Sequence, residues 1–116
     1  MYHVLIIEDE PLLALDLQDI LSDLGVTSFD FAATENEAIE AARRHAPDII
    51  TSDVKLLEGT GPAAVDIIYR ERGEIPVLFI TATPEACEPC NPPGQILPKP
   101  INAARIAIAF RNMTRA

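Results

Sequence analysis

Two kinds of hydrophobic pattern alternate along the chain: short apolar runs, and longer segments in which apolar residues recur at helical spacing. Two of the short runs, residues 3–7 and 48–53, predict buried strands, and two further apolar runs also predict strands. A fifth short segment alternates weakly and also favours a strand. The five predicted strands are residues 3–7, 27–32, 48–53, 76–80 and 95–98.

The first two predicted helices carry clear start and stop signals. Pro11 fits the first turn of a helix, where its missing N–H costs nothing, and Gly25 is a natural stop. Thr34 with Glu37 three residues later predicts a capping box for a second helix that runs to about residue 45. The apolar face of the first helix consists of Leu13, Leu17, Ile20, Leu21 and Leu24.

Two further helices are predicted after the third and the fifth strands. Pro62 opens one that ends near Gly73, and Asn102 caps the last one. Pro98 cannot donate to a neighbouring strand, so we expect residues 95–98 at the edge of the sheet. The predicted inner faces are Val65, Ile68 and Tyr69 in the first of these helices and Ile106, Phe110 and Met113 in the second.

Strands that are separated by helical crossovers form a parallel sheet with helices on both faces. Residues 84–95 contain four prolines, so any helix between the fourth and fifth strands is expected to be short or irregular. The 116 residues are enough for one domain of this kind. The sequence therefore predicts a doubly wound, five-stranded α/β domain over residues 1–116.

Composition and charge exclude several classes of function. A formal charge of −9 without a basic run argues against a nucleic-acid surface, which requires clustered Lys and Arg. No apolar stretch is long enough to span a membrane, and three acids at residues 8–10 interrupt the first apolar run before it resembles a signal peptide. We expect a cytoplasmic protein whose acidity suits a metal site or a basic partner.

Cys87 and Cys90 form a CxxC pair. A redox pair of the thioredoxin type opens a helix directly after a strand, whereas this pair lies among prolines, well past the preceding strand. A structural zinc site needs four ligands, and the other candidates, His3 and His45, are distant in the sequence. We expect two loop thiols that stay reduced in the cytosol.

Side chains that carry chemistry follow four of the five strands. Glu8 and Asp9 come after the first, Asp53 after the third, Thr81 after the fourth and Lys99 after the fifth. In an open parallel sheet these strand ends share one edge, where ligands bind. Clustered carboxylates repel one another unless a cation joins them, and oxygen ligands with room for water favour Mg²⁺. An ionised aspartate needs no separate base to act as a nucleophile. The pattern predicts phosphoryl transfer onto Asp53, although an aspartate that only caps a turn has the same local sequence.

With these residues the whole chain resembles a response-regulator receiver domain of two-component signalling, with a flavodoxin-like strand order of 2-1-3-4-5 and no output domain. The resemblance implies that Asp53 is the phospho-acceptor and that Glu8 and Asp9 hold Mg²⁺. It also implies that Thr81 is the switch hydroxyl and that Lys99 pairs with the phosphoryl oxygens.

One further ligand is implied by the resemblance, and three features depart from the family. The backbone carbonyl of Lys55 is expected among the metal ligands. Glu8 replaces the aspartate that is commonest at the first acidic position, and it keeps the charge. Ile96 stands where many receivers carry a Tyr or Phe that swings inward with the switch hydroxyl. The interval 82–98 is short and rich in proline, so dimerisation through this region is not assumed.

These expectations describe a phospho-accepting signalling domain that is not an enzyme beyond its own phosphorylation and dephosphorylation. A histidine kinase or phosphotransfer protein would donate the phosphoryl group, and a downstream protein would read the changed surface. Three alternatives stay open. A receiver-like module that binds a partner without phosphate would keep the same fold. An aspartate-nucleophile phosphatase would need a second acid at the position of Lys55. An FMN-binding module would need a phosphate loop where residues 8–10 are acidic.

Overall fold

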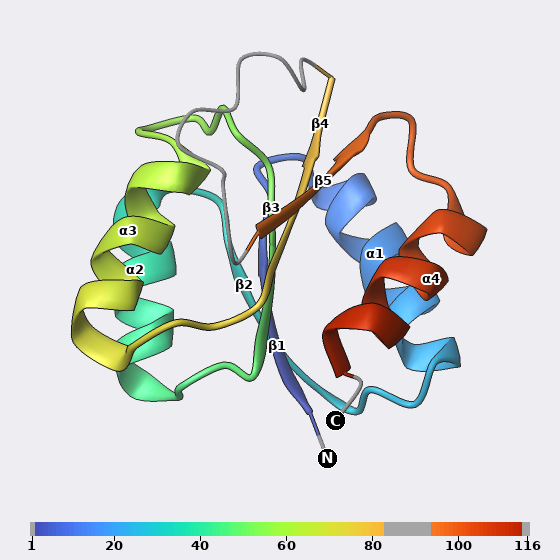
Figure 1. The fold of residues 1–116 in the computed structure, drawn as a ribbon. Helices are drawn as coiled ribbons and strands as arrows, with labels where there is room; N and C mark the ends of the chain where they lie inside the picture. Colours follow the sequence, from blue (N-terminus) through green and yellow to red (C-terminus); the bar gives the residue numbers. More distant parts are fainter. Residues whose placement is uncertain (1, 83–93, 115–116) are drawn as a thin grey trace.

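The computed structural model describes residues 2–82 and 94–114, in which five strands form one parallel sheet (Figure 1). Hydrogen-bonded neighbours give the order β2-β1-β3-β4-β5, so the predicted sheet and its order are confirmed. The strand that ends in proline lies at an edge, as predicted. The strands are β1 His3–Ile7, β2 Ser28–Ala32, β3 Ile49–Ser52, β4 Val77–Thr81 and β5 Gly94–Pro98.

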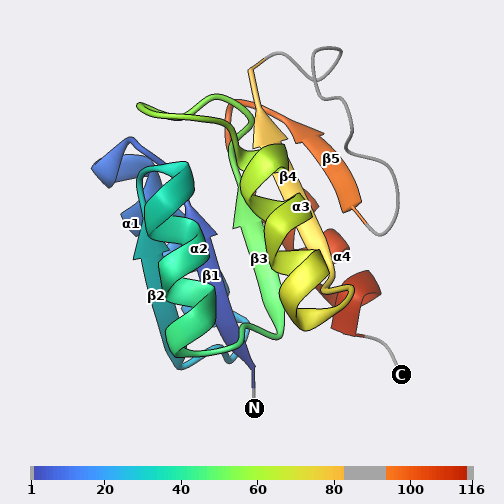
Figure 2. The same cartoon turned by 90° about the vertical axis from the view of Figure 1, so that its left-hand side faces the viewer.

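Four helices of the described residues cover the sheet, two on each face. Figures 1 and 2 show α1 and α4 on one face and α2 and α3 on the other. Within the described part of the chain, no helix is long and apolar enough to cross a membrane. The helices are α1 Pro11–Asp23, α2 Glu35–Arg44, α3 Gly61–Arg72 and α4 Ala103–Thr114.

One prediction about the fold falls outside the described residues. The short or irregular helix expected between β4 and β5 belongs to residues 83–93, as do Cys87 and Cys90.

Each face of the sheet has its own apolar core, because successive side chains of a strand point to opposite faces. In β3, Ile50 belongs to the core beneath α2 and α3, whereas Ile49 belongs to the core beneath α1 and α4. The three central strands β1, β3 and β4 are buried along their full length, which explains why their sequences are mostly apolar and do not alternate with exposed polar residues. Buried helix residues in the two cores include Leu17, Leu21, Val65, Ile68, Ile106 and Phe110.

Polar caps fix where three of the helices begin. The Thr34 hydroxyl accepts a hydrogen bond from the N–H of Glu37 at 3.1 Å, and Thr60 and Asn102 cap α3 and α4 in the same way at 3.2 and 3.0 Å. The carboxylate of Glu37 accepts from the N–H of Ala33, one residue before the cap. The predicted capping box therefore closes on Ala33 and not on Thr34 itself.

Thr51 lies in the middle of β3 and is 1% exposed. Its hydroxyl is the one buried side-chain polar atom, among the described residues, that lacks a hydrogen-bond partner. Its neighbours in register are Ile6 on β1 and Leu78 on β4, which offer no polar side-chain atom. A buried hydroxyl without a partner costs about 1–3 kcal/mol of stability.

Thr51→Val replaces this hydroxyl with a methyl group of similar size. We expect the free energy of unfolding to rise by about 1 kcal/mol, because the unpaired polar atom is removed. Thr34→Val is the matched control: the same change removes a cap and should lower the free energy of unfolding by about 1 kcal/mol. Urea unfolding followed by circular dichroism measures both. A loss of stability in Thr51→Val would contradict the account of an unpaired hydroxyl.

Candidate functional site

Backbone hydrogen bonds past the strand ends align the residues of the acidic edge, which we define as Glu8, Asp9, Glu10, Asp53 and Lys99. Asp53 follows β3 directly, and its N–H donates to the carbonyl of Ile7 at the end of β1, at 2.9 Å. The N–H of Lys99 donates to the carbonyl of Thr81 at the end of β4, also at 2.9 Å. Residues from three separate strand ends are thereby held at one edge of the sheet.

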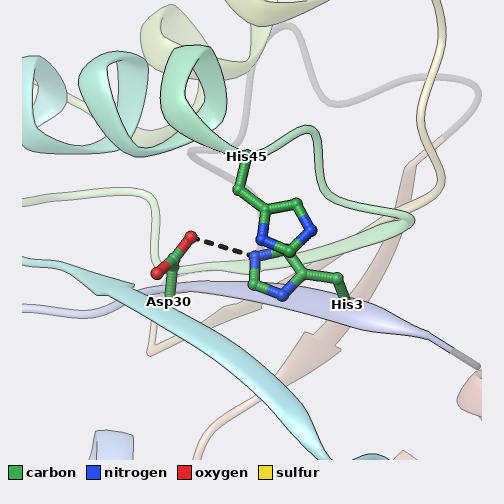
Figure 3. A group of neighbouring side chains, drawn as sticks. All are labelled: His3, Asp30 and His45. Atoms are coloured by element: carbon green, nitrogen blue, oxygen red, sulfur yellow. Dashed lines mark hydrogen bonds and ion pairs between the residues drawn. The ribbon is translucent and has the colours of Figure 1, made fainter.

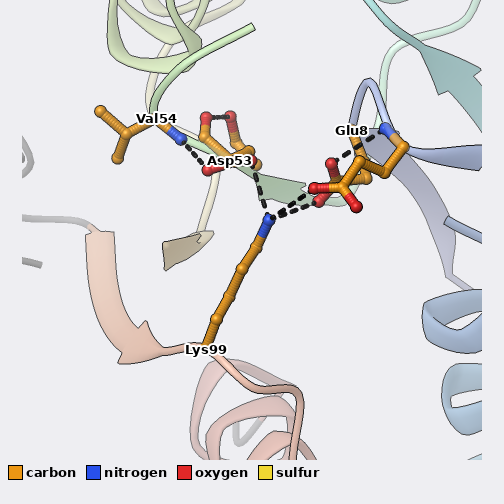
Figure 4. A network of polar contacts seen from close by, with 6 residues as sticks. Glu8, Asp53, Val54 and Lys99 are labelled. Atoms are coloured by element: carbon orange, nitrogen blue, oxygen red, sulfur yellow. Dashed lines mark hydrogen bonds and ion pairs between the residues drawn. The ribbon is translucent and has the colours of Figure 1, made fainter. Parts of the chain in front are cut away.

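The ammonium group of Lys99 lies between two carboxylates that belong to other strand ends (Figure 4). Its Nζ is 2.9 Å from Oδ2 of Asp53 and 3.3 Å from Oε1 of Glu8. The side chains of Lys99, Asp53 and Glu8 are 15%, 12% and 2% exposed, so water screens these charges weakly. Two carboxylates thus share one ammonium group at a site where solvent screening is weak.

Burial raises the pKa of the Glu8 carboxyl, against the opposing effects of the Glu10 N–H and of Lys99, and the nearby carboxylate of Asp53 raises it further. Burial alone would lower the pKa of Lys99. The hydrogen bond to Asp53 and the charge of Glu8 outweigh that effect, so the pKa of Lys99 is raised above 10.5. Lys99 is therefore charged at neutral pH, and the acidic edge favours a further cation.

The two carboxylate oxygens of Asp53 have different partners. Oδ1 accepts a hydrogen bond from the N–H of Val54 at 2.7 Å, while Oδ2 faces Lys99. Behind Asp53, the N–H of Gly61 donates to the carbonyl of Val54 at 2.8 Å. A Cβ atom at Gly61 would overlap the carbonyl of Asp53 and the hydroxyl of Ser52, so only glycine allows this close approach. The loop after β3 thus fixes the direction of the Asp53 carboxylate.

Two other predicted site residues differ in their surroundings. Thr81 is 2% exposed at the end of β4 and binds Lys99 through its backbone carbonyl. Lys55 is exposed and forms an isolated bridge with Thr60 in the loop after β3. Ile96, the departure on β5, is 38% exposed and pairs in register with Phe79 of β4.

Three consecutive acids after β1 approach one another closely. Glu8, Asp9 and Glu10 each bring a carboxylate oxygen within 4.8 Å of the others. Sequence reasoning gave no role to Glu10, yet its N–H donates to Oε2 of Glu8 at 3.1 Å and its carboxylate lies 4.0 Å from Nζ of Lys99. The unbroken run of acids at residues 8–10 was the available signal.

The response regulator receiver domain family matches residues 4–111, and the chain belongs to this family. The phyllosphere-induced regulator PhyR of Methylorubrum extorquens is 41% identical over 85 residues, which cover 72% of this chain and 32% of that protein. This chain therefore spans about a third of the length of that curated relative.

Solved structures of receiver domains have the same fold. The PhyR receiver domain of Erythrobacter litoralis superposes with a TM-score of 0.86 at 32% identity, covering 97% of this chain and 88% of that one. The receiver domain of a Pseudomonas aeruginosa sensor histidine kinase, described with a magnesium ion in its active-site cleft, gives a TM-score of 0.84 at 23% identity, covering 97% and 96%. The class is thus the phospho-accepting domain of two-component signalling.

Lys99→Met removes the positive charge between Glu8 and Asp53 and leaves two shielded carboxylates facing each other. We expect the free energy of unfolding to fall by about 3 kcal/mol at pH 7 in EDTA, because a buried pair loses one partner. Lys55→Met, an exposed lysine in the same region, is the control and should change it by less than about 0.5 kcal/mol. Urea unfolding measures both variants.

The contribution of Lys99 also has a defined pH dependence. Its pKa is raised in the folded state, so the stabilisation is fully present below pH 10.5 and is lost as the pH rises through the higher folded value. A Lys99→Met variant as stable as the unmodified protein at pH 7 would contradict the account of the ion pair.

Proposed function

We propose that Asp53 accepts a phosphoryl group from a histidine kinase or phosphotransfer protein in a reaction that depends on Mg²⁺. The supporting observation is the contact of Asp53 with Lys99 beside the buried carboxylate of Glu8. A nucleophilic carboxylate, a fixed positive charge and an acidic group suited to a metal thereby share one site.

The acidic edge fits Mg²⁺ by the chemistry of its donors, which are all oxygen atoms. Glu8, Asp9 and Asp53 would supply carboxylates, and Lys55 would supply its backbone carbonyl. The carboxylates carry more negative charge than Lys99 neutralises, so a divalent ion would relieve their repulsion. When bound, Mg²⁺ would neutralise charge on the phosphoryl oxygens.

The remaining residues would act through the contacts that they already make. Val54 holds Oδ1 of Asp53 through its N–H, so the carboxylate keeps one orientation during attack. The ammonium group of Lys99 would move from the carboxylate to a phosphoryl oxygen, which carries more negative charge. The Thr81 hydroxyl would donate a hydrogen bond to the same group.

Phosphorylation would change contacts between strands as well as the charge at Asp53. Lys99 would leave its present ion pairs with Asp53 and Glu8, and its backbone is bonded to Thr81 at the end of β4. Movement of Lys99 and Thr81 would therefore alter the surface at the ends of β4 and β5. A downstream protein would read that altered surface.

An apolar groove of about 370 Å³ beside the acidic edge suits the phosphoryl donor. It lies between the start of α1 and the end of β2, where Leu15 and Phe31 are 53% and 47% exposed. A protein that presents a phosphohistidine to Asp53 would cover these apolar side chains. The groove is lined by Glu8, Asp9, Pro11, Ala14, Leu15, Phe31, Ala32, Ala33 and Glu37.

The alternatives have weaker support. A module that binds partners without phosphate does not require Lys99 to be held against two shielded carboxylates. An aspartate-nucleophile phosphatase needs an acid two residues after Asp53, and the exposed Lys55 occupies that place.

Asp53→Asn should abolish phosphorylation by acetyl phosphate in the presence of Mg²⁺, because the amide is not a nucleophile of this kind. Asp66→Asn, which changes an exposed aspartate of α3, should leave it intact. Intact-mass spectrometry counts the phosphoryl groups, and a sample with EDTA tests the need for metal. A phosphoryl adduct on Asp53→Asn equal to that on Asp66→Asn would refute the assignment of the acceptor.

Glu8→Gln should weaken Mg²⁺ binding about tenfold or more, because a charged ligand is replaced by a neutral one. Glu58→Gln removes the same charge from an exposed loop position and should leave Mg²⁺ affinity nearly unchanged. The dependence of the phosphorylation rate on Mg²⁺ concentration gives both values. Equal effects of the two substitutions on Mg²⁺ affinity would mean that Glu8 acts only through the net charge of the protein and is not a ligand.

A further inference from the structure

A second polar cluster lies at the end of the sheet opposite the acidic edge. His3 begins β1, whereas Glu8 follows its end, so about 16 Å separates them at about 3.3 Å per residue. Figure 3 shows His3 together with Asp30 of β2 and His45, which follows the end of α2. We call these three residues the histidine cluster.

His3 is the buried centre of the histidine cluster, at 6% exposure. Its Nε2 lies 2.9 Å from Oδ2 of Asp30, and its Nδ1 lies 2.6 Å from the hydroxyl of Ser28. The rings of His3 and His45 stack with centroids 3.6 Å apart and an angle of 9° between their planes. One ligand atom from each member lies within 4.8 Å of the other two.

We infer that the histidine cluster binds a divalent transition-metal ion, with Zn²⁺ as the ion that its ligands suit. Zinc binds imidazole nitrogens together with a carboxylate oxygen, whereas Mg²⁺ takes oxygen ligands, so the two histidines favour zinc. With three protein ligands, the fourth position of a tetrahedral ion is left for water. The formal charge of −9 favours cation binding further.

Ser28 supplies the second contact that metal-binding histidines usually have. For a neutral His3 ring, an ionised Asp30 can only accept, which places the ring proton on Nε2 and leaves the Ser28 hydroxyl to donate to Nδ1. A metal ion bound to Nε2 would require the ring proton to be on Nδ1, and the Ser28 hydroxyl would then accept a hydrogen bond from that N–H. The same hydrogen-bond partner thus supports the ring in both states, as second-layer partners of zinc ligands do.

Small movements bring the three ligands to the distances that zinc requires. Ligand atoms at about 2.0–2.2 Å from a tetrahedral ion lie about 3.3 Å apart. The gap between His3 and Asp30 is 2.9 Å and needs only a slight opening. The nitrogen lone pairs of two stacked imidazole rings lie in parallel planes and do not converge on one ion. His45 must therefore rotate about its side-chain torsions to bind the same ion as His3. His45 is exposed, and its side chain makes no hydrogen bond to any described residue, so it is free to turn.

Zinc at the histidine cluster would join three segments that are far apart in the sequence: the start of β1, the middle of β2 and the end of α2. The acidic edge is not part of this connection. The inference is therefore independent of the proposed phosphorylation of Asp53.

The test uses the imidazole signals of ¹⁵N-labelled protein, because the chain has only two histidines and both belong to the histidine cluster. Millimolar Mg²⁺ is kept present to occupy the acidic edge. Cys87→Ser with Cys90→Ser removes thiolates, which bind zinc tightly. One equivalent of Zn²⁺ should shift both rings and move the proton of His3 from Nε2 to Nδ1, whereas Mg²⁺ alone should shift neither ring.

Two variants separate the site from adventitious binding, and neither removes buried His3. His45→Gln should lower zinc affinity at least about tenfold and leave the His3 tautomer unchanged at one equivalent. Ser28→Ala should lower affinity about 10–100-fold through the lost support of Nδ1. Asp23→Asn, at the exposed end of α1, is the control and should keep the affinity of the parent. Unshifted rings, or equal affinity in His45→Gln and the parent, would overturn the inference.

Discussion

One ammonium group, 2.9 Å from one carboxylate and 3.3 Å from another, connects the ends of three strands at a shielded edge of the sheet. The parallel sheet makes this contact possible because it brings the carboxyl ends of β1, β3 and β5 to the same side. It also makes the contact necessary, since Glu8 and Asp53 would otherwise repel each other with little screening. The ion pairs of Lys99 thus stabilise the acidic edge. The carboxylate charge that Lys99 does not neutralise would attract a further cation.

The same arrangement would allow the proposed reaction at Asp53 to alter the surface. Asp53 is held by the N–H of Val54 and by the tight loop at Gly61, so its position is fixed before any donor arrives. In the proposed reaction Lys99 would be the part that moves, because its long side chain reaches from the end of β5 to Asp53 and its backbone is joined to Thr81. A phosphoryl group on Asp53 would compete for that side chain, and the ends of β4 and β5 would respond.

Much of the fold and of the acidic edge could be predicted because the signals are local. Apolar runs predicted the buried strands, and capping residues predicted where helices begin. The positions directly after the strands predicted where the acids and Lys99 lie. The position of Glu10 against Lys99 was missed, because only folding determines how far Lys99 reaches. The stacking of His3 on His45 could not be read either, because it depends on how the end of α2 packs over β1. The unpaired hydroxyl of Thr51 is likewise visible only once its neighbours in the sheet are known.

Chemical mapping of the phosphorylated residue tests the central claim most directly. After incubation with acetyl phosphate and Mg²⁺, borohydride reduces an aspartyl phosphate to homoserine, and tandem mass spectrometry of the peptides locates it. Homoserine is expected at position 53 alone, because Asp53 is the one aspartate of the described residues whose fixed carboxylate contacts the Lys99 ammonium group. Homoserine at position 9, or at any position other than 53, would contradict it.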